Sequence, residues 1–258
     1  MIEVSGFSKR YDGTQAVTDL SFSVARGEIL GLVGLNGAGK TTTLRSICGI
    51  LTPTSGRILV GGFDVSKQPV EAKRRLAYVP DTPHPFELLT VAEHLKFIGL
   101  AYGAPYAGDG VDALLRRLDL HEKRDAFAST LSRGQQQKLA IACAFLRAPE
   151  ALLLDEPLTG LDPAGMRVMR DAVAEEAARG AAVIVSSHQL ELVERMCSRV
   201  LVLHRGKLRA LGTLEEVRAI AGKDATASLE DVFFALTEGS QDGEPPASTH
   251  PTTERLPG

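Results

Sequence analysis

The chain has 258 residues, of which 44% are hydrophobic, and it carries a formal net charge of −3. This size allows one large α/β domain or a core with an inserted lobe, and the slight negative charge speaks against nucleic-acid binding. The longest apolar run, Leu139 to Leu146, is far shorter than the roughly 20 residues that span a bilayer, so the chain is not expected to cross a membrane.

The amino-terminal region reads as β structure. Met1-Ile2-Glu3-Val4 lacks the basic and apolar segments of a secretory signal, so we expect the protein to remain in the cytosol. Residues 2–33 read as short strands, and residues 57–65 as a second β segment. Together they predict a small, partly antiparallel sheet beside the main core.

Tyr11 falls on the predicted loop between the first two strands. An aromatic ring there can stack on an adenine base, a contact of about 1–3 kcal/mol where bases stack on aromatic side chains. Plain packing is the alternative for a loop tyrosine, and the residue pattern leaves both open.

A phosphate-binding pattern follows the apolar run that begins at Ile29. The stretch Gly34-Leu35-Asn36-Gly37-Ala38-Gly39-Lys40-Thr41 matches G-x-x-x-x-G-K-[ST] and leads into helical spacing. The backbone N–H groups from Gly34 to Thr42 and the helix start can then point at one anion. Lys40 would reach the β and γ phosphates, and the Thr41 hydroxyl would bind Mg²⁺. An ordinary glycine-rich turn is the alternative.

Residues from about 85 to 149 have a helical pattern that no strand interrupts. Thr90 and Glu93 have the spacing of a capping box, and so do Ser132 and Gln135 at the start of a later helix. We expect this block to form a helical lobe inserted between strands of the core.

Two carboxylates end the next buried strand, Ala151-Leu152-Leu153-Leu154. Asp155 suits Mg²⁺, and Glu156 is the candidate base for an attacking water. A pair of acids that only caps the next helix is the alternative. His188 follows another apolar strand and is expected at the same sheet edge, where it can sense or hold a γ phosphate. A structural role is the alternative for a lone histidine.

The carboxyl-terminal part contains a helix that starts at Asp162-Pro163, a hairpin around Arg205-Gly206-Lys207 and short helices up to Leu236. We expect an accessory segment over about 205–236 and a disordered tail over 237–258, which is rich in proline and small polar residues. The three isolated cysteines, Cys48, Cys143 and Cys197, are expected to be reduced core thiols.

These motifs together resemble the nucleotide-binding subunit of ATP-binding cassette (ABC) transporters over about residues 2–215. The P-loop alone does not single out this family. The more specific feature is Leu131-Ser132-Arg133-Gly134-Gln135, which is similar to the signature L-S-G-G-Q. It precedes the acidic strand, which is followed by Leu161-Asp162 and the His188 switch.

The resemblance implies an α/β fold of the P-loop NTPase (RecA-like) type over residues 1–236, with a parallel-sheet core, a flanking antiparallel β subdomain and the inserted lobe. It implies ATP and Mg²⁺ as ligands and a second nucleotide-binding subunit, identical or different, paired head to tail. Ser132, Gly134 and Gln135 would then face the ATP held by the partner subunit. The resemblance also implies an integral membrane permease, contacted by the helical lobe and the loop near Asp81, at the cytoplasmic face of the membrane.

Two positions depart from the family pattern. Asp81 stands where the family usually has glutamine, and an acid there can still bind Mg²⁺ or water. Arg133 replaces the first glycine of the signature pair, and we expect its side chain to point away from the nucleotide.

Alternatives to a transport motor remain. One is an ABC-family ATPase that acts in translation or DNA maintenance, although those chains usually carry two cassettes or a long coiled coil, and this chain has no heptad arm between Lys40 and Ser132. Another is a regulatory nucleotide-binding module, which would be favoured if Glu156 were dispensable. Asp81 and residues 228–233 resemble exporter cassettes and favour export.

Overall fold

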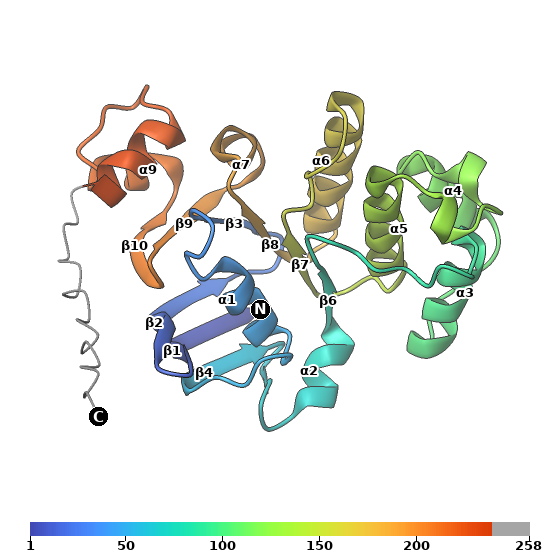
Figure 1. The fold of residues 1–258 in the computed structure, drawn as a ribbon, viewed down its shortest axis with the longest axis horizontal. Coiled ribbons are helices and arrows are strands. Elements are labelled where there is room, and N and C mark those ends of the chain that lie inside the picture. Colours follow the sequence, from blue (N-terminus) through green and yellow to red (C-terminus); the bar gives the residue numbers. More distant parts are fainter. Residues whose placement is uncertain (239–258) are drawn as a thin grey trace, which may run out of the picture.

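The computed structural model describes residues 1–238, which form two sheets with helices packed between and around them (Figure 1). The larger sheet has six strands in the order β10-β9-β3-β8-β7-β6. Its strands are β3 Ile29–Val33, β6 Leu76–Val79, β7 Ala151–Asp155, β8 Ala182–Ser187, β9 Arg199–His204 and β10 Lys207–Gly212. Strands β6, β7, β8, β3 and β9 pair in parallel, and β10 pairs antiparallel with β9, as the predicted hairpin requires. The predicted parallel-sheet core is therefore confirmed.

The smaller sheet has four strands in the order β2-β1-β4-β5, all paired antiparallel. Its strands are β1 Ile2–Tyr11, β2 Thr14–Val24, β4 Ser55–Val60 and β5 Phe63–Asp64. Strands β1 and β2 form one long hairpin rather than the several short strands that we expected. The chain reverses at Asp12 and Gly13, which both have positive φ, so the alternating pattern continues on either side of a tight turn.

Helix α1 Lys40–Ile47 lies between the two sheets. Its buried Leu44 and Ile47 share one apolar core with Phe7 of β1 and Leu153 of β7. Since a side chain of this size contributes about 1.5–3 kcal/mol when fully buried, this core fixes the helix start against both sheets. The P-loop, which connects β3 to α1, is thereby held at the end of the parallel sheet.

The predicted helical lobe lies at one end of the molecule (Figure 1). After α2 Pro69–Arg75 and β6, it contains α3 Val91–Tyr102, α4 Asp109–Arg117 and α5 Arg133–Leu146, with short 3-10 helices at His121–Lys123 and Ala128–Thr130. Thr90 and Ser132 form the two predicted capping boxes. The lobe shares its core with the sheet and with α6 Pro163–Ala178, so it is packed onto the nucleotide core rather than tethered to it.

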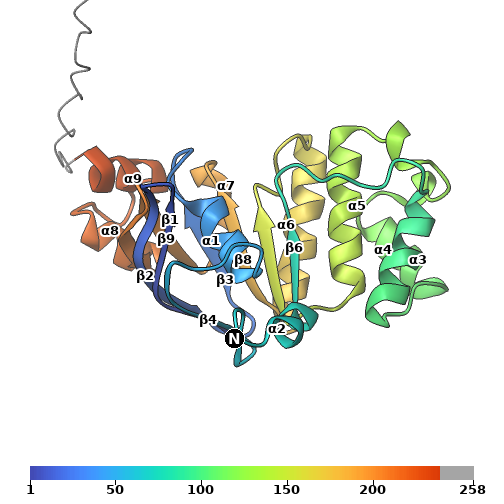
Figure 2. The ribbon, with the colours of Figure 1, turned by 60° about the horizontal axis from the view of Figure 1, so that its bottom comes forward.

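The last helices lie toward the opposite end of the molecule. Helices α8 Leu214–Ile220 and α9 Leu229–Glu238 form that end, and α7 Leu190–Met196 lies between them and α6 (Figure 2). Helix α9 contains Thr237 and Glu238, which we had assigned to the tail, because Phe233 and the residues around it pack into a core. The rest of the predicted tail, residues 239–258, lies outside the described part of the chain. Among the helices of residues 1–238, none has the length and apolar character needed to cross a membrane.

The three cysteines are free thiols, as predicted. Cys48 and Cys197 are buried, and Cys143 is partly buried. Burial raises the pKa of the thiols of Cys143 and Cys197 to about 12, because the thiolate loses its hydration. Both thiols are therefore neutral, unreactive core groups.

Candidate nucleotide-binding site

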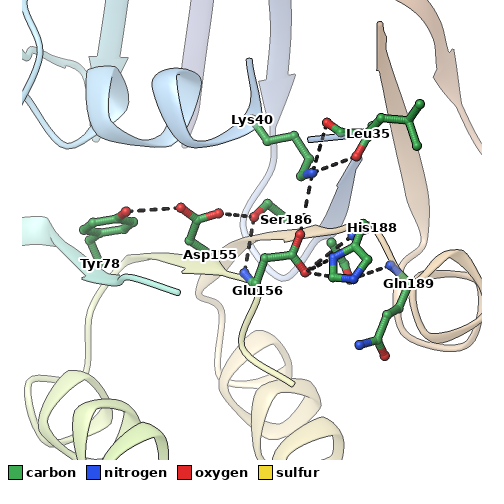
Figure 3. A network of polar contacts seen from close by, with 10 residues as sticks. Leu35, Lys40, Tyr78, Asp155, Glu156, Ser186, His188 and Gln189 are labelled. Carbon is green, nitrogen blue, oxygen red and sulfur yellow. Dashed lines mark hydrogen bonds and ion pairs between the residues drawn. The ribbon is translucent and has the colours of Figure 1, made fainter. Parts of the chain in front are cut away.

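Parallel pairing brings the predicted motifs to one edge of the large sheet. In the sheet register Asp155 lies opposite Ser186, and Val33 lies opposite Ser187. The P-loop begins directly after Val33, so it lies beside the ends of β7 and β8. Figure 3 shows Lys40, Glu156 and His188 in one polar network at this edge.

The P-loop turns tightly against neighbouring backbone. A Cβ atom on Gly34 would lie 2.4 Å from the carbonyl oxygen of Leu203 and 2.8 Å from Cβ of Ala38. Gly39, with φ of 105°, would place a Cβ 2.8 Å from the carbonyl oxygen of Ala16. Both positions therefore require glycine, and they let the loop wrap closely around the start of α1.

The Lys40 side chain folds back over the P-loop. Its Nζ donates a hydrogen bond to the carbonyl of Gly34 at 2.6 Å and another to that of Leu35 at 3.5 Å. It also lies 3.6 Å from Oε1 of Glu156. The ammonium group is thus placed between the loop and the acidic strand end, where a phosphate bound by the loop would meet it.

Asp155 is 2% exposed, and both of its carboxylate oxygens accept hydrogen bonds (Figure 3). Ser186 Oγ donates to Oδ1 at 2.5 Å, and Tyr78 Oη donates to Oδ2 at 3.3 Å. Burial, and then the nearby Asp155, raise the pKa of Tyr78 to about 12, so its hydroxyl remains a donor at neutral pH. Sequence reasoning missed both donors. Knowledge of the strand order would have pointed to them, because Tyr78 lies on β6 and Ser186 on β8, the two strands beside β7.

Glu156 follows β7 in a left-handed backbone conformation, with φ of 50°. Its N–H donates to the carbonyl of Ser186 at 3.0 Å, which continues the sheet pairing past the strand end. Oε2 lies 3.0 Å from Nδ1 of His188 and accepts from Ser187 Oγ at 3.2 Å. The predicted base and the predicted switch histidine are therefore in direct contact, and Glu156 bridges His188 and Lys40.

A cavity of ≈ 230 Å³ lies over the P-loop. The loop and the first turn of α1 line it, together with Ala16, Asp81, Asp155 and Glu156. The backbone donors, Lys40 and the Thr41 and Thr42 side chains fit a polyphosphate, and the carboxylates of Asp155 and Asp81 fit Mg²⁺. Within residues 1–238 no three His, Cys, Asp or Glu side chains form a metal cluster.

Tyr11 is five positions before Ala16, which lines this cavity, but Tyr11 itself is not part of the lining. It ends β1, is 39% exposed, and its ring centroid lies 5.1 Å from Nζ of Lys9. An exposed ring with one cation over it can still receive a base. Its role toward adenine remains a proposal.

The signature residues lie at the start of α5, outside the cavity lining. Ser132 is the N-cap, and its Oγ accepts the N–H of Gln135 at 3.3 Å while Oε1 of Gln135 accepts the N–H of Ser132 at 3.0 Å. A Cβ on Gly134 would lie 3.0 Å from the carbonyl oxygen of Gly160, so the helix start packs closely on that loop. Ser132 is exposed at this helix end.

The two departures from the family pattern lie together. Nη2 of Arg133 is 3.6 Å from Oδ1 of Asp81. Arg133 therefore extends toward the rim of the phosphate cavity in its own chain, through an acid that lines that cavity.

A strand, P-loop and helix, with an acidic strand end facing the loop lysine, define a P-loop nucleotide-binding ATPase. Comparison with known proteins gives the family. Residues 17–159 match the family model described as ABC transporter, so the chain belongs to the ABC transporter family and is an ATP-binding subunit of such a transporter.

Curated relatives and a solved structure agree with this assignment. The ABC-type transporter ATP-binding protein EcsA of Bacillus subtilis is 35% identical over 241 residues, which cover 92% of this chain and 97% of the relative. The linearmycin resistance ATP-binding protein LnrL of the same organism is 33% identical over 89% of this chain and 74% of its own length. A solved structure described as an ATP-binding subunit of an ABC transporter matches with a TM-score of 0.85 and 36% identity, over 92% of this chain and 99% of that chain.

Proposed function

We propose that this chain hydrolyses ATP as one of two nucleotide-binding subunits and thereby drives transport through a separate integral membrane subunit. ATP and Mg²⁺ would bind at the P-loop cavity, where Mg²⁺ neutralises charge on the phosphates. The observation that carries this proposal is Glu156, which lies between Lys40 and His188 at the mouth of the P-loop.

Glu156 is suited to accept a proton from the water that attacks the γ phosphate. His188 and Ser187 bind one of its oxygens, so the carboxylate is oriented before the substrate arrives. Lys40 contacts the other oxygen, and phosphate oxygens would replace Glu156 as its partner when ATP binds. That exchange would free one carboxylate oxygen for the water.

A second subunit would complete the site from outside. Ser132 and Gly134 are at the amino end of a 14-residue helix and lie outside the cavity of their own chain. The helix dipole and the Ser132 hydroxyl favour an anion, so they suit the γ phosphate bound by a facing subunit. Loss of that phosphate on hydrolysis would remove a contact shared by both subunits and let them separate.

The Glu156→Gln variant tests the proposed chemistry. Loss of the base should lower turnover by about a hundredfold or more, because general-base catalysis typically contributes that much. ATP binding should be retained, and the stalled complex should elute as a dimer on a sizing column only when ATP is present. Glu175→Gln is the matched control, since Glu175 pairs with Arg117 and Arg179 on the outer side of α6. Unchanged turnover in Glu156→Gln would reject Glu156 as the base.

An exposed apolar surface is the proposed docking site for the membrane subunit. Phe86, Leu88, Phe97 and Leu100 are between 48% and 85% exposed. A groove of ≈ 240 Å³ beside Phe86 and Phe97 leads to Pro80, which is next to Asp81 of the phosphate cavity. Apolar patches of this kind mark interaction sites, and this one lies close enough to the ATP site to receive its movement.

Export is the proposed direction. It is supported by the acid at Asp81, by the sequence of residues 228–233 and by the resistance function in the name of the relative LnrL. The transporter name of the relative EcsA also argues against a role in translation or DNA maintenance.

A further inference from the structure

Asp81 both lines the phosphate cavity and forms an ion pair with Arg133. It is the second residue after β6 and lines the phosphate cavity together with Thr41, Asp155 and Glu156. Its Oδ1 also lies 3.6 Å from Nη2 of Arg133. One carboxylate thus joins the chain's own phosphate pocket to the first residue of α5.

The aliphatic part of the Arg133 side chain also packs against Gly160. A Cβ on Gly160 would lie 3.4 Å from Cδ and 3.6 Å from Cγ of Arg133, so the aliphatic stem of the arginine covers this glycine. Gly160 has φ of 80° and directly precedes Leu161-Asp162. The guanidinium is therefore aimed at Asp81 from a stem that rests on the loop before α6.

The two departures from the family pattern account for this contact jointly. Glutamine in place of Asp81 would offer no charge to the guanidinium, and glycine in place of Arg133 could not reach Asp81. The contact therefore needs both residues.

We propose that Asp81 and Arg133 form a positioning pair that links the chain's phosphate pocket to the orientation of Ser132 and Gly134. A nucleotide with Mg²⁺ competes for the Asp81 carboxylate and weakens its hold on Arg133. The start of α5 thereby senses whether its own pocket is filled. The consequence for a facing subunit rests on the proposed function, whereas the pair itself does not.

An incidental surface ion pair is the competing explanation, since the side chains of Arg133 and Asp81 are 56% and 48% exposed. Exposed pairs contribute little to the stability of the whole protein. The pair is therefore tested by the local order of α5 and by nucleotide affinity, not by unfolding.

The experiment is a double-mutant cycle on the full chain with Asp81→Asn, Arg133→Gln and both together. The first readout is hydrogen exchange of the amides at the start of α5 in nucleotide-free protein. Each single change should speed exchange about two- to fivefold, and the double change should add nothing further. The coupling should fall toward zero in about 0.5 M salt, because ions screen exposed charges.

The second readout is the affinity for ATP with Mg²⁺, measured by titration calorimetry. Arg133→Gln should change the dissociation constant about two- to fivefold when Asp81 is present, and should have no effect in the Asp81→Asn background. A purely structural role would give the same change in both backgrounds. Arg195→Gln is the control, because Arg195 forms an exposed ion pair with Glu191 on α7, and its loss should alter neither readout.

Additive effects of the two substitutions in both readouts would overturn the proposed pair. The result is separable from that of the proposed function, which depends on the ATP-bound dimer of Glu156→Gln. If the double-mutant cycle shows coupling but Glu156→Gln forms no dimer with ATP, the dimer is rejected and the Asp81–Arg133 pair is kept. If Glu156→Gln forms a dimer but the two substitutions are additive, only the pair is rejected.

Discussion

At the scale of single residues, the site depends on carboxylates whose positions are set by neutral donors. Asp155 is almost fully buried, and a buried charge is costly unless hydrogen bonds satisfy it. Ser186 and Tyr78 donate one bond to each of its two oxygens, so the carboxylate is fixed from two neighbouring strands. We therefore regard Tyr78 as a positioning residue for the proposed Mg²⁺ ligand.

Tyr78→Phe removes this donor while keeping the ring. We expect the Mg²⁺ concentration needed for half-maximal ATPase activity to rise about two- to tenfold, because a hydrogen bond to a charged group contributes about 1.5–3 kcal/mol and this bond, at 3.3 Å, is long and therefore at the weak end. The assay is a Mg²⁺ titration at saturating ATP. Tyr102→Phe, on the exposed end of α3, should leave the curve unchanged. An unchanged curve for Tyr78→Phe would show that Ser186 alone positions Asp155.

At the scale of elements, the carboxyl-terminal helices support the strand that carries the P-loop. Phe233 of α9 is 2% exposed and shares a core with Val33, the last residue of β3, and with Val193 of α7. Its neighbour Phe234 is 44% exposed. The buried face of α9 thus packs against the end of β3, directly before the P-loop.

The two phenylalanines form a matched pair for a stability test. Phe233→Ala should lower the free energy of unfolding by about 3 kcal/mol, since truncation of a buried phenylalanine leaves a cavity. Phe234→Ala should lower it by less than about 1 kcal/mol, because that ring is already in contact with water. Urea unfolding monitored by circular dichroism measures both values. Equal losses would mean that α9 does not pack on the sheet as described.

At the scale of the whole molecule, the ATP site lies between two ends with different surfaces. The helical lobe carries the exposed Phe86 and Phe97 at one end, and α8 and α9 close the other (Figure 2). The apolar groove and the phosphate cavity share the segment that contains Pro80 and Asp81. Under the proposed function, movement of this segment would be a short physical route between ATP and a docked membrane subunit.

Phe97→Asp tests the docking surface without touching the ATP site. A charge on the apolar patch should reduce recovery of an integral membrane partner from native membranes by about tenfold or more, since a buried unpaired charge is strongly unfavourable in an interface. Affinity purification followed by mass spectrometry gives the ratio, and calorimetry checks that ATP binding is retained. Ile220→Asp, an equally exposed position on α8, is the control. Full recovery with Phe97→Asp would place the partner on another surface, and recovery with ribosomes or DNA would contradict the transport function.

The sequence alone determined the features that depend on neighbours in the chain. The P-loop between strand and helix, the capping boxes at Thr90 and Ser132, and the N-cap at Asp162 are local because each joins residues only a few positions apart. Parallel strand order then predicted that Lys40, Glu156 and His188 would share one edge. The end of α9 was misjudged because burial of Phe233, not local composition, keeps that helix folded.

Only the tertiary structure decided the contacts between distant segments. Tyr78 reaches Asp155 because β6 pairs with β7, and the sequence gives no direct sign of that register. Arg133 meets Asp81 because the lobe packs its last helix beside the end of β6, across about fifty residues of chain. Such contacts depend on how whole elements pack, and that packing is set by the combined burial of many side chains rather than by any one motif.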